Sequence, residues 1–165
     1  MTITAKILKL GDNINTDVII PGRYLESIDP DELGRHALEG LDPTFPHKAK
    51  EGVILVAGKN FGCGSSREQA PIALKSAGVR CIIAESFARI FFRNAINIGL
   101  PVLECEGISQ TTSEGDTLSV DLANGIVENK TTGKVMRANP LPQFILKLIE
   151  KGGLIPHVRA LVEKS

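Results

Sequence analysis

The sequence predicts a single α/β domain, spanning residues 1–165, that joins a parallel βαβαβ segment to an antiparallel appendage. Between residues 53 and 105, short apolar runs alternate with helical patterns, as in strands joined by helical crossovers. Between residues 115 and 138 the pattern changes to period two, which indicates antiparallel strands. A length of 165 residues suits one domain whose core needs no disulfides.

The first third of the chain predicts one strand and one helix. ITAKILKL, residues 3–10, alternates as a strand does, and the polar cluster GDNINTD after it favours a turn. Asp29 before Pro30 is typical of an N-cap and a first helical position, so we expect a short helix that Gly40 closes. Residues 41–52, LDPTFPHKAKEG, are predicted to form a surface loop.

The middle of the chain carries the parallel segment. Residues 53–57 and the run VRCIIAE are predicted buried strands, and the helix PIALKSAG between them should end at Gly78. The helix SFARIFFRNAINIG should end at Gly99, before a third strand in LPVLEC. One face of that helix is expected to gather apolar side chains, namely Phe87, Ile90, Phe91, Ala95 and Ile98. Because functional loops lie at the carboxyl ends of parallel strands, NFGCGSSR after the first strand is a candidate site.

The last third predicts a hairpin followed by two helices. Asn124-Gly125 is a candidate type I′ turn between DTLSVDL and IVENK, and KVMRA adds a further strand. LPQFILKLIEKGG and LIPHVRALVEK predict two short helices, which Gly152-Gly153 separates.

Composition argues against several classes of partner. Lys plus Arg and Asp plus Glu both number 19, and aromatic residues make up only 4%, which disfavours nucleic-acid binding. The N-terminus lacks the apolar run of a secretory signal, and no run of about 18 apolar residues predicts a membrane span. We therefore expect a cytoplasmic protein with neither nucleic acid nor membrane as a partner.

Metal binding by this chain is not predicted. The cysteines are Cys63, Cys81 and Cys105. Their spacing fits neither a disulfide framework nor a C-x-x-C motif, so reduced thiols are expected. The histidines, His36, His47 and His157, show no spacing typical of metal ligands either.

Three further charged residues are candidates for roles near a site. Arg89 and Arg93 lie four apart on a predicted helix, and we interpret them as solvated or subunit-facing rather than catalytic. Asp17 either orients the neighbouring loop or makes a turn hydrogen bond.

The loop NFGCGSSREQAP, residues 60–71, fits none of three standard glycine motifs. It lacks the lysine of a P-loop, the third glycine of a dinucleotide fingerprint and the G-x-S-x-G of a nucleophile elbow. Its glycines permit an irregular backbone close to a ligand, and a following helix N-terminus offers N–H groups to an anion. Arg67 can hold a carboxylate by two hydrogen bonds, with Ser65 and Ser66 beside it.

The alternative for these serines is helix capping. Ser65 with Glu68, and Ser66 with Gln69, both match the capping box. Pro71 disfavours this interpretation, because its ring would collide with a backbone carbonyl if the helix were already regular there. Sequence spacing leaves both alternatives open.

Two long segments resemble a known signature. GKNFGCGSSREQAPIALKSAGVRCIIAESFARIFFRNAINIGLPV and the opening GDNINTDVIIPGRYL are similar to the small-subunit, or swivel-domain, signature of the aconitase superfamily. The resemblance covers nearly the whole chain and implies a swivelling β/β/α-type domain. It is greatest to the small subunits of 3-isopropylmalate dehydratases, with those of homoaconitases as near kin. These are two-chain enzymes in which the large subunit carries a [4Fe-4S] cluster, so this chain is expected to hold no cofactor.

The resemblance implies a role for each residue of the GSSR motif. The family's hydro-lyases remove water from a 2-hydroxy acid and add it back in the other orientation. Ser65 falls on the position of the catalytic base, and Arg67, with Ser66, on positions that hold a substrate carboxylate. The implied partners are a large subunit and a hydroxy-dicarboxylate.

The resemblance also places substrate discrimination in a loop near GRYL. That loop contains Tyr24, Leu25, Glu26 and Ser27. Glu26 would repel an additional carboxylate if it faced inward, which favours isopropylmalate over homoaconitate and leaves a dimethylmalate possible. Asn15 replaces the Asp that the family usually shows, and we assign it no role beyond the turn.

A hypothesis from a different class also fits the residues. The chain would then be a stand-alone carboxylate-binding or regulatory module that uses the same Arg67 pocket.

Overall fold

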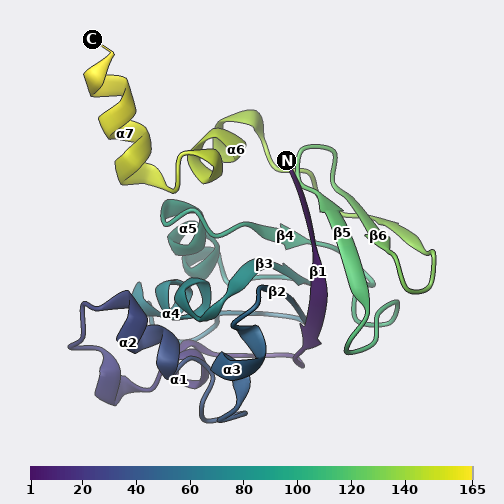
Figure 1. Cartoon of the computed structure of the whole chain (residues 1–165), viewed down its shortest axis with the longest axis horizontal. Coiled ribbons are helices and arrows are strands. Elements are labelled where there is room, and N and C mark those ends of the chain that lie inside the picture. The colour runs from purple at the N-terminus through teal and green to yellow at the C-terminus, as the bar shows by residue number, and fades with distance from the viewer. Residues whose placement is uncertain (165) are drawn as a thin grey trace.

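The computed structural model describes residues 1–164, and within them seven strands form one mixed sheet (Figure 1). The strands are β1 (Thr2–Lys9), β2 (Val53–Ala57), β3 (Val79–Ala84), β4 (Val102–Glu104), β5 (Thr117–Asp121), β6 (Ile126–Asn129) and β7 (Val135–Arg137). Their order across the sheet is β4-β3-β2-β1-β5-β6-β7. The helices are α1 (Thr16–Ile19), α2 (Pro30–Arg35), α3 (Phe45–Ala49), α4 (Gln69–Ala77), α5 (Arg89–Asn97), α6 (Gln143–Glu150) and α7 (Leu154–Glu163), with a 3-10 turn η1 (Gly22–Tyr24).

Strand β1 joins the two predicted parts of the sheet. Its C-terminal end pairs in parallel with β2, at Ile7 with Ile54, and its N-terminal end pairs antiparallel with β5. Strands β2, β3 and β4 are parallel, whereas β5, β6 and β7 are antiparallel. The predicted α/β class, with a parallel segment and an antiparallel appendage, is therefore confirmed.

The pattern of buried residues differs between the parallel and the antiparallel parts of the sheet. Every residue of β2 is buried, as expected for a parallel strand covered on both faces, while β5 and β6 alternate buried and half-buried positions. In Figure 1 helices α1 to α5 gather beside the parallel strands, and the β5–β6 hairpin extends on the other side of β1. Helix α7 lies at the periphery with no buried residue.

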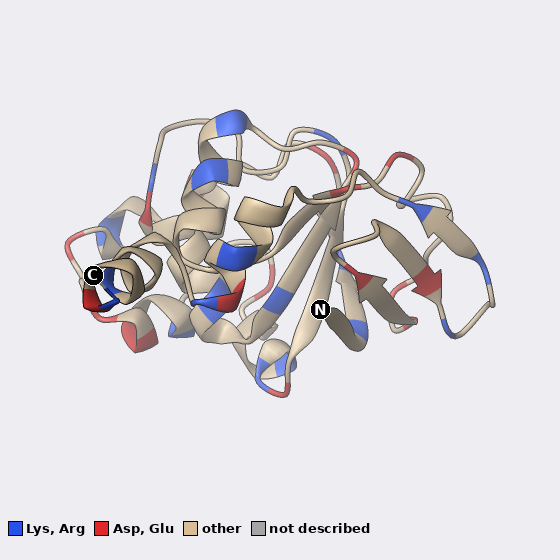
Figure 2. Ribbon diagram, turned by 90° about the horizontal axis from the view of Figure 1, so that it is seen from above, with Lys and Arg blue, Asp and Glu red and all other residues tan. Residues whose placement is uncertain are grey.

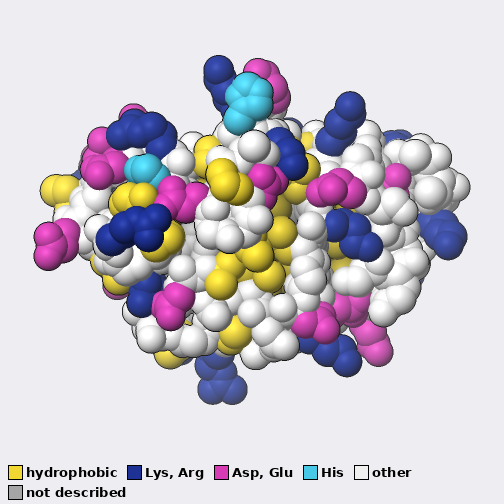
Figure 3. All heavy atoms as spheres, turned by 90° about the horizontal axis from the view of Figure 1, so that it is seen from below, with side chains coloured by type: hydrophobic (Ala, Val, Ile, Leu, Met, Phe, Trp, Pro, Cys, Tyr) yellow, Lys and Arg dark blue, Asp and Glu magenta, His cyan; other side chains and the backbone are white. Residues whose placement is uncertain are grey.

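The surface of the described chain mixes charges of both signs. Figure 2 shows basic and acidic residues interspersed along the ribbon. Figure 3 shows one face on which hydrophobic side chains gather in the middle and charged side chains surround them. None of the helices within residues 1–164 has the length and apolar character needed to cross a lipid bilayer.

The predicted loop at residues 41–52 is wrong, because it contains helix α3. Thr44 is the N-cap residue, Pro46 lies in the first turn, and Phe45 and Ala49 are buried in the core. Proline at the start of a helix was the sequence signal for this element. This five-residue helix is stable because its apolar residues are buried.

Helix α2 begins as predicted but ends early. Asp29 caps it by accepting a hydrogen bond from the backbone N–H of Asp31 at 3.0 Å. The helix ends at Arg35 rather than near Gly40, and Leu38 adopts a left-handed φ of 54°. The N–H of Leu38 donates to the carbonyl of Ile19 at 2.8 Å, so a tertiary contact replaces the helical bond.

The predicted apolar face of α5 is partly wrong. The helix spans Arg89–Asn97, so Phe87 and Ile98 lie outside it. Phe91 and Ala95 are buried as expected, whereas Ile90 is 50% exposed. Phe61 packs edge-on against Phe91, with ring centroids 5.2 Å apart.

The predicted β5–β6 hairpin is confirmed, but its turn is not type I′. That turn requires positive φ at both central residues, and here Gly125 has φ 66° whereas Asn124 does not have positive φ. Asn124 instead donates its side-chain amide to Asp121 at 2.8 Å, which stabilises a longer connection. The two C-terminal helices, separated at Gly152-Gly153, are present as predicted.

Candidate active site

The bend after β2 is held against the N-terminal segment by a short parallel bridge between Asn15 and Cys63. The N–H of Gly62 donates to the carbonyl of Ile14 at 2.7 Å, and the N–H of Thr16 donates to the carbonyl of Cys63 at 2.9 Å. Two segments distant in sequence therefore meet backbone to backbone. The side chains that follow the bridge in the two segments therefore lie close together.

The two glycines of the bend serve different purposes. Both adopt left-handed φ values, 82° at Gly62 and 91° at Gly64. A Cβ on Gly62 would lie 2.2 Å from Cγ of Phe91, so only glycine permits this close packing against α5. At Gly64 the nearest atom would be Cβ of Asn15 at 3.5 Å, so only the backbone conformation demands glycine there.

A hollow of about 210 Å³ lies where the bend, the start of α1 and the first turns of α5 meet. It is lined by Thr16, Gly62, Gly64, Ser65, Ser66, Arg67, Ala88, Arg89, Ile90, Phe91 and Asn94. The structure therefore brings the sequence-predicted residues Ser65, Ser66 and Arg67 to one cavity. We refer to it below as the Ser65 hollow.

The two serines present free hydroxyls on a fixed backbone. Both residues are exposed, and neither hydroxyl has a hydrogen-bond partner within residues 1–164. The hydroxyl of the buried Thr16 donates to the carbonyl of Ser65 at 2.6 Å. This bond holds the Ser65 main chain and leaves its side chain available to a ligand.

The helix-capping alternative for these serines is wrong. Helix α4 begins at Gln69, its N-cap residue is Glu68, and no side chain caps it. The N–H of Ala70 bonds to the carbonyl of Arg67 at 3.2 Å, so the turn before the helix closes through the backbone. The serines lie too far upstream to act as caps.

The guanidinium of Arg67 is anchored by the α1 segment. Its Nη2 lies 2.5 Å from Oδ1 of Asp17, and its Nη1 donates to the carbonyl of Ile20 at 3.2 Å. The Arg67 side chain is only 17% exposed. Of the two roles considered for Asp17, the structure thus supports orientation of the site, while Asn15 makes the turn hydrogen bond, accepting from Val18 N–H at 2.9 Å.

The loop Tyr24, Leu25, Glu26 and Ser27 does not line the Ser65 hollow. The Tyr24 hydroxyl donates to Glu39 at 2.8 Å, and the Tyr24 ring stacks on His36 with centroids 3.9 Å apart. Ser27 donates to Glu32 at 2.8 Å. Burial acts to raise the pKa of Glu39, but hydrogen bonds from Tyr24 and His36 outweigh it and lower that pKa.

This loop nevertheless touches the edge of the site. The carbonyl of Leu25 accepts a hydrogen bond from the Gln69 side chain at 3.1 Å, and a Cβ on Gly22 would lie 3.8 Å from Nη1 of Arg67. Glu26 is exposed, and within residues 1–164 its side chain makes no hydrogen bond or ion pair with the residues that line the hollow. In this chain alone, the loop is thus a neighbour of the hollow rather than one of its walls.

The residues that line the hollow all fall within a match to a known protein family. Residues 11–107, which include the bend and the start of α5, match the family described as the aconitase C-terminal domain. The chain belongs to the aconitase C-terminal domain family.

Relatives of this aconitase-family chain match over almost its full length. It is 56% identical to the 3-isopropylmalate dehydratase small subunit of Caldicellulosiruptor bescii, over 100% of this chain and 99% of that protein. It is 52% identical to the isopropylmalate/citramalate isomerase small subunit of Methanocaldococcus jannaschii, over 99% and 97%. A crystal structure of 3-isopropylmalate dehydratase from Methanocaldococcus jannaschii superposes with a TM-score of 0.91 at 42% identity, covering 99% of this chain and 98% of that one.

The cysteines of this aconitase-family chain do not fit a metal cluster. Burial raises the pKa of Cys81 to about 12 and that of Cys105 to about 11, so both remain thiols at neutral pH. In the part of the chain that the structure describes, no three His, Cys, Asp or Glu side chains gather as metal ligands.

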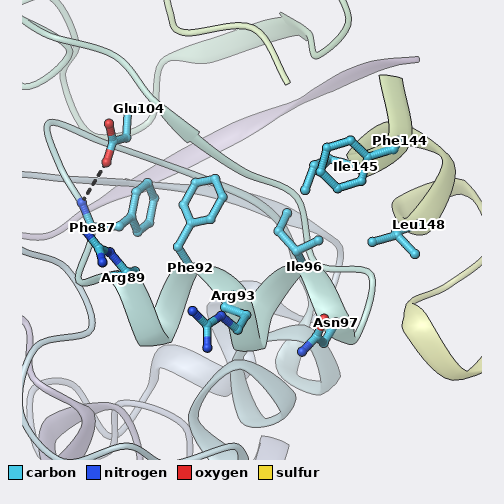
Figure 4. Close-up of a pocket in the computed structure, with 10 residues that line it drawn as sticks. All are labelled: Phe87, Arg89, Phe92, Arg93, Ile96, Asn97, Glu104, Phe144, Ile145 and Leu148. Atoms are coloured by element: carbon cyan, nitrogen blue, oxygen red, sulfur yellow. Dashed lines mark hydrogen bonds between the residues drawn. The ribbon is translucent and has the colours of Figure 1, made fainter. Parts of the chain in front are cut away.

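A larger groove of about 560 Å³ lies between α5 and α6 (Figure 4). Its apolar lining is Phe87, Phe92, Ile96, Phe144, Ile145 and Leu148, and its polar lining is Arg89, Arg93, Asn97 and Glu104. Glu104 accepts a hydrogen bond from the N–H of Phe87 at 3.3 Å. Arg89 lines both this groove and the Ser65 hollow, so the two cavities adjoin.

Sequence reasoning missed several residues of the hollow. Thr16, Ile90 and Asn94 line it beside the predicted motif, and none was proposed. For Thr16 the available signal was the family-like opening GDNINTD, which contains it. For Ile90 there was no such signal, because the apolar pattern predicts it on the buried face of the helix, whereas it is 50% exposed.

Proposed function

We propose that this chain is the small subunit of a two-chain hydro-lyase that isomerises 2-isopropylmalate to 3-isopropylmalate, a step of leucine biosynthesis. The observation that carries the proposal is the open hollow that contains Ser65, Ser66 and Arg67. It occurs in a chain 56% identical, over its whole length, to a 3-isopropylmalate dehydratase small subunit. We propose further that residues 1–165 act as one domain in the cytoplasm.

Ser65 is the proposed base. The proton to be removed lies on the carbon next to a substrate carboxylate, and the base must be an alkoxide or close to one. Ser65 is exposed, its hydroxyl has no protein partner among the described residues, and it lines a cavity that Arg67 also lines. Positive charge and backbone N–H donors stabilise an oxyanion and thereby lower the pKa of its conjugate acid.

Backbone donors are available at this cavity. The first turn of α5 lines the hollow, and its N-cap residue Ala88 makes no side-chain hydrogen bond to it. The first N–H groups of a helix have no acceptor within that helix. In the proposal, they and Arg67 together stabilise negative charge as the proton leaves the substrate.

Arg67 and Ser66 are the proposed ligands of one substrate carboxylate. Asp17 and the carbonyl of Ile20 use two edges of the Arg67 guanidinium and hold its plane in place. Arginine has five N–H donors, so this anchoring leaves donors for a carboxylate. Such pre-organisation reduces the entropy lost when the substrate binds.

The proposed complex also contains a large subunit, because this chain alone does not close the hollow. The hollow is open at Ser65, and a reaction that generates an alkoxide benefits from the exclusion of water. We expect the [4Fe-4S] cluster on that large subunit, where it supplies a Lewis acid for the hydroxyl that leaves.

The lining of the hollow also bears on the identity of the substrate. Ile90 gives the hollow a half-exposed aliphatic side chain, which suits a branched alkyl substituent. A relative 52% identical to this chain is named for both isopropylmalate and citramalate, so citramalate is the second candidate. Homoaconitate and dimethylmalate belong in the same test, because Glu26 lies outside the hollow in the free chain.

The test is reconstitution with the large subunit, followed by kinetics on these four acids. We expect the highest kcat/KM for isopropylmalate, and a decrease in kcat of about a thousandfold or more for Ser65→Ala. Ser66→Ala is the matched control: it should act mainly on KM. A Ser65→Ala complex with wild-type turnover would refute the base assignment. If the complex is inactive on all four acids, while the isolated chain binds a dicarboxylate at micromolar concentration, the chain is instead a binding module.

A further inference from the structure

Two cations line the Ser65 hollow, and their surroundings differ. Arg67 lies 2.5 Å from the carboxylate of Asp17, which compensates its charge. Arg89 is exposed, and its side chain has no ion pair or hydrogen bond with any residue in the described range 1–164. The uncompensated positive charge of the hollow is therefore that of Arg89.

The charge of Arg89 matters because the proposed substrate is an anion. The inference rests on the proposed function in this respect. A hydroxy-dicarboxylate carries two negative charges at neutral pH, since carboxylic acids have pKa values near 4. One carboxylate is assigned to Arg67 and Ser66. The second would enter a site of low dielectric without a partner unless another donor is present, and an unpaired buried charge is strongly disfavoured.

We propose that Arg89 binds the second carboxylate of the substrate. Arg89 is the first residue of α5, and α5 forms the wall of the hollow that faces the glycine bend. Arg89 lies where the hollow meets the α5–α6 groove, at the end of the helix shown in Figure 4. A dicarboxylate held at one end by Arg67 and at the other by Arg89 extends across the hollow, past Ser65.

Arg93 provides an internal comparison. It lies one turn further along the same helix, is exposed, and has no ion pair with a residue of the described chain. It lines the α5–α6 groove but not the Ser65 hollow. A general effect of positive charge on an anionic substrate would thus involve both arginines, whereas direct contact involves only Arg89.

The experiment compares Arg89→Gln with Arg93→Gln in the complex reconstituted with the large subunit. Arg89→Gln should raise KM for isopropylmalate about tenfold or more, with kcat changed by less than about threefold. Arg93→Gln should leave both within about twofold. Arg89→Lys keeps the charge but not the planar fork, so it should recover part of the loss. Equal effects of the two glutamine variants, or an unchanged KM for Arg89→Gln, would overturn the proposal.

A change of substrate charge separates contact from structural damage. In an isopropylmalate analogue, the carboxylate assigned to Arg89 is replaced by a carboxamide. Arg89→Gln should then change KM by less than about twofold, because the interaction is already absent in the wild type. An equally large change with both substrates would mean that Arg89 acts on the fold rather than on the ligand.

A second readout does not depend on turnover. The isolated full chain, labelled with ¹⁵N, is titrated with 2-isopropylsuccinate, a dianion that lacks the hydroxyl. We expect the signals of the Arg89 side chain and the Ile90 amide to shift in the wild type. The shift of the Ile90 amide should vanish in Arg89→Gln but persist in Arg93→Gln. Shifts with an inactive complex would leave the binding role intact and reject only the proposed reaction. If the Arg89 and Ile90 signals do not respond in the wild type, Arg89 is not a ligand of the dianion.

Discussion

The carboxylate of Asp17 lies 2.5 Å from Nη2 of Arg67, and this pair joins the α1 segment to the glycine bend. The contact exists because Asn15 and Cys63 pair in parallel just before these two residues. The bridge brings the segments together, and the ion pair then orients the guanidinium at the edge of the Ser65 hollow. Backbone pairing thus determines the geometry of a side chain proposed to bind substrate.

Removing the Asp17 carboxylate should impair activity far more than stability. In Asp17→Ala the Arg67 side chain can turn away from its binding position, so we expect kcat/KM to decrease by about 10- to 100-fold. Because the Asp17 side chain is 63% exposed, the pair contributes less than about 1 kcal/mol to folding. Steady-state kinetics of the complex and thermal unfolding of the chain measure the two effects. Asp17→Asn keeps an oxygen acceptor and should lose less, and wild-type kinetics in Asp17→Ala would contradict an orienting role.

Thr16 is predicted to hold the main chain of the proposed base. Its hydroxyl donates to the Ser65 carbonyl at 2.6 Å, and the residue is 2% exposed. Thr16→Val removes this bond with little change of shape, so it should destabilise the chain by about 1 kcal/mol. We expect kcat to decrease about tenfold, because Ser65 loses its fixed position. Thr16→Ser retains the hydroxyl and should behave like the wild type. If valine and serine variants have the same kcat, the hydrogen bond has no catalytic consequence.

The two glycines of the bend give a matched test of packing against backbone strain. Gly62→Ala places a Cβ 2.2 Å from the Phe91 ring at a φ of 82°, so it combines a collision with a left-handed conformation. Gly64→Ala meets no atom closer than 3.5 Å, and only the conformation opposes it. We expect a loss of about 1 kcal/mol for Gly64→Ala and at least about 2 kcal/mol more for Gly62→Ala. Urea unfolding of the isolated chain measures both. Equal losses would show that Phe91 moves aside freely.

The sequence was sufficient to predict elements whose pattern is local. The strands at residues 53–57 and 79–84, the helix between them and the hairpin all follow from apolar runs and their spacing. Helix α3 was missed because Phe45 and Ala49 form too short a pattern, and burial decides whether five residues become helical. The turn at Asn124-Gly125 was misjudged because Asn124 finds a partner in Asp121, which stabilises a different connection.

The candidate site was predictable only in part, for a related reason. Ser65, Ser66 and Arg67 are adjacent in sequence, so a motif can place them together. The contacts of Arg67 with Asp17 and of Thr16 with Ser65 depend on pairing between distant segments, and no local pattern contains that pairing. Likewise, the apolar pattern predicts Ile90 on the buried face of the helix, whereas the structure leaves it 50% exposed at the hollow.

A buried polar pair in the antiparallel part of the sheet should make stability depend on pH. The pKa of Asp116 lies below its ordinary value of 3.8, first because the Asn129 side chain donates to it and next because the Ser113 N–H does. The Asn129 amide lies 2.9 Å from Oδ2 of Asp116, and both residues are buried. A carboxyl whose pKa is lowered by folding stabilises the folded state above its unfolded pKa. That contribution is lost as the pH falls through the lower, folded value.

Asp116→Asn should therefore be less stable than the wild type at pH 7, and the difference should shrink as the pH falls below about 3.8. Urea unfolding of the isolated chain at a series of pH values from neutral to acidic measures it. Asp121→Asn is the matched control: the pKa of Asp121 is also lowered by an asparagine, Asn124, but in a more exposed turn, so the difference at pH 7 should be smaller. A stability difference for Asp116→Asn that is the same at every pH would mean that the variant disturbs packing, and that the charge of Asp116 does not stabilise the sheet.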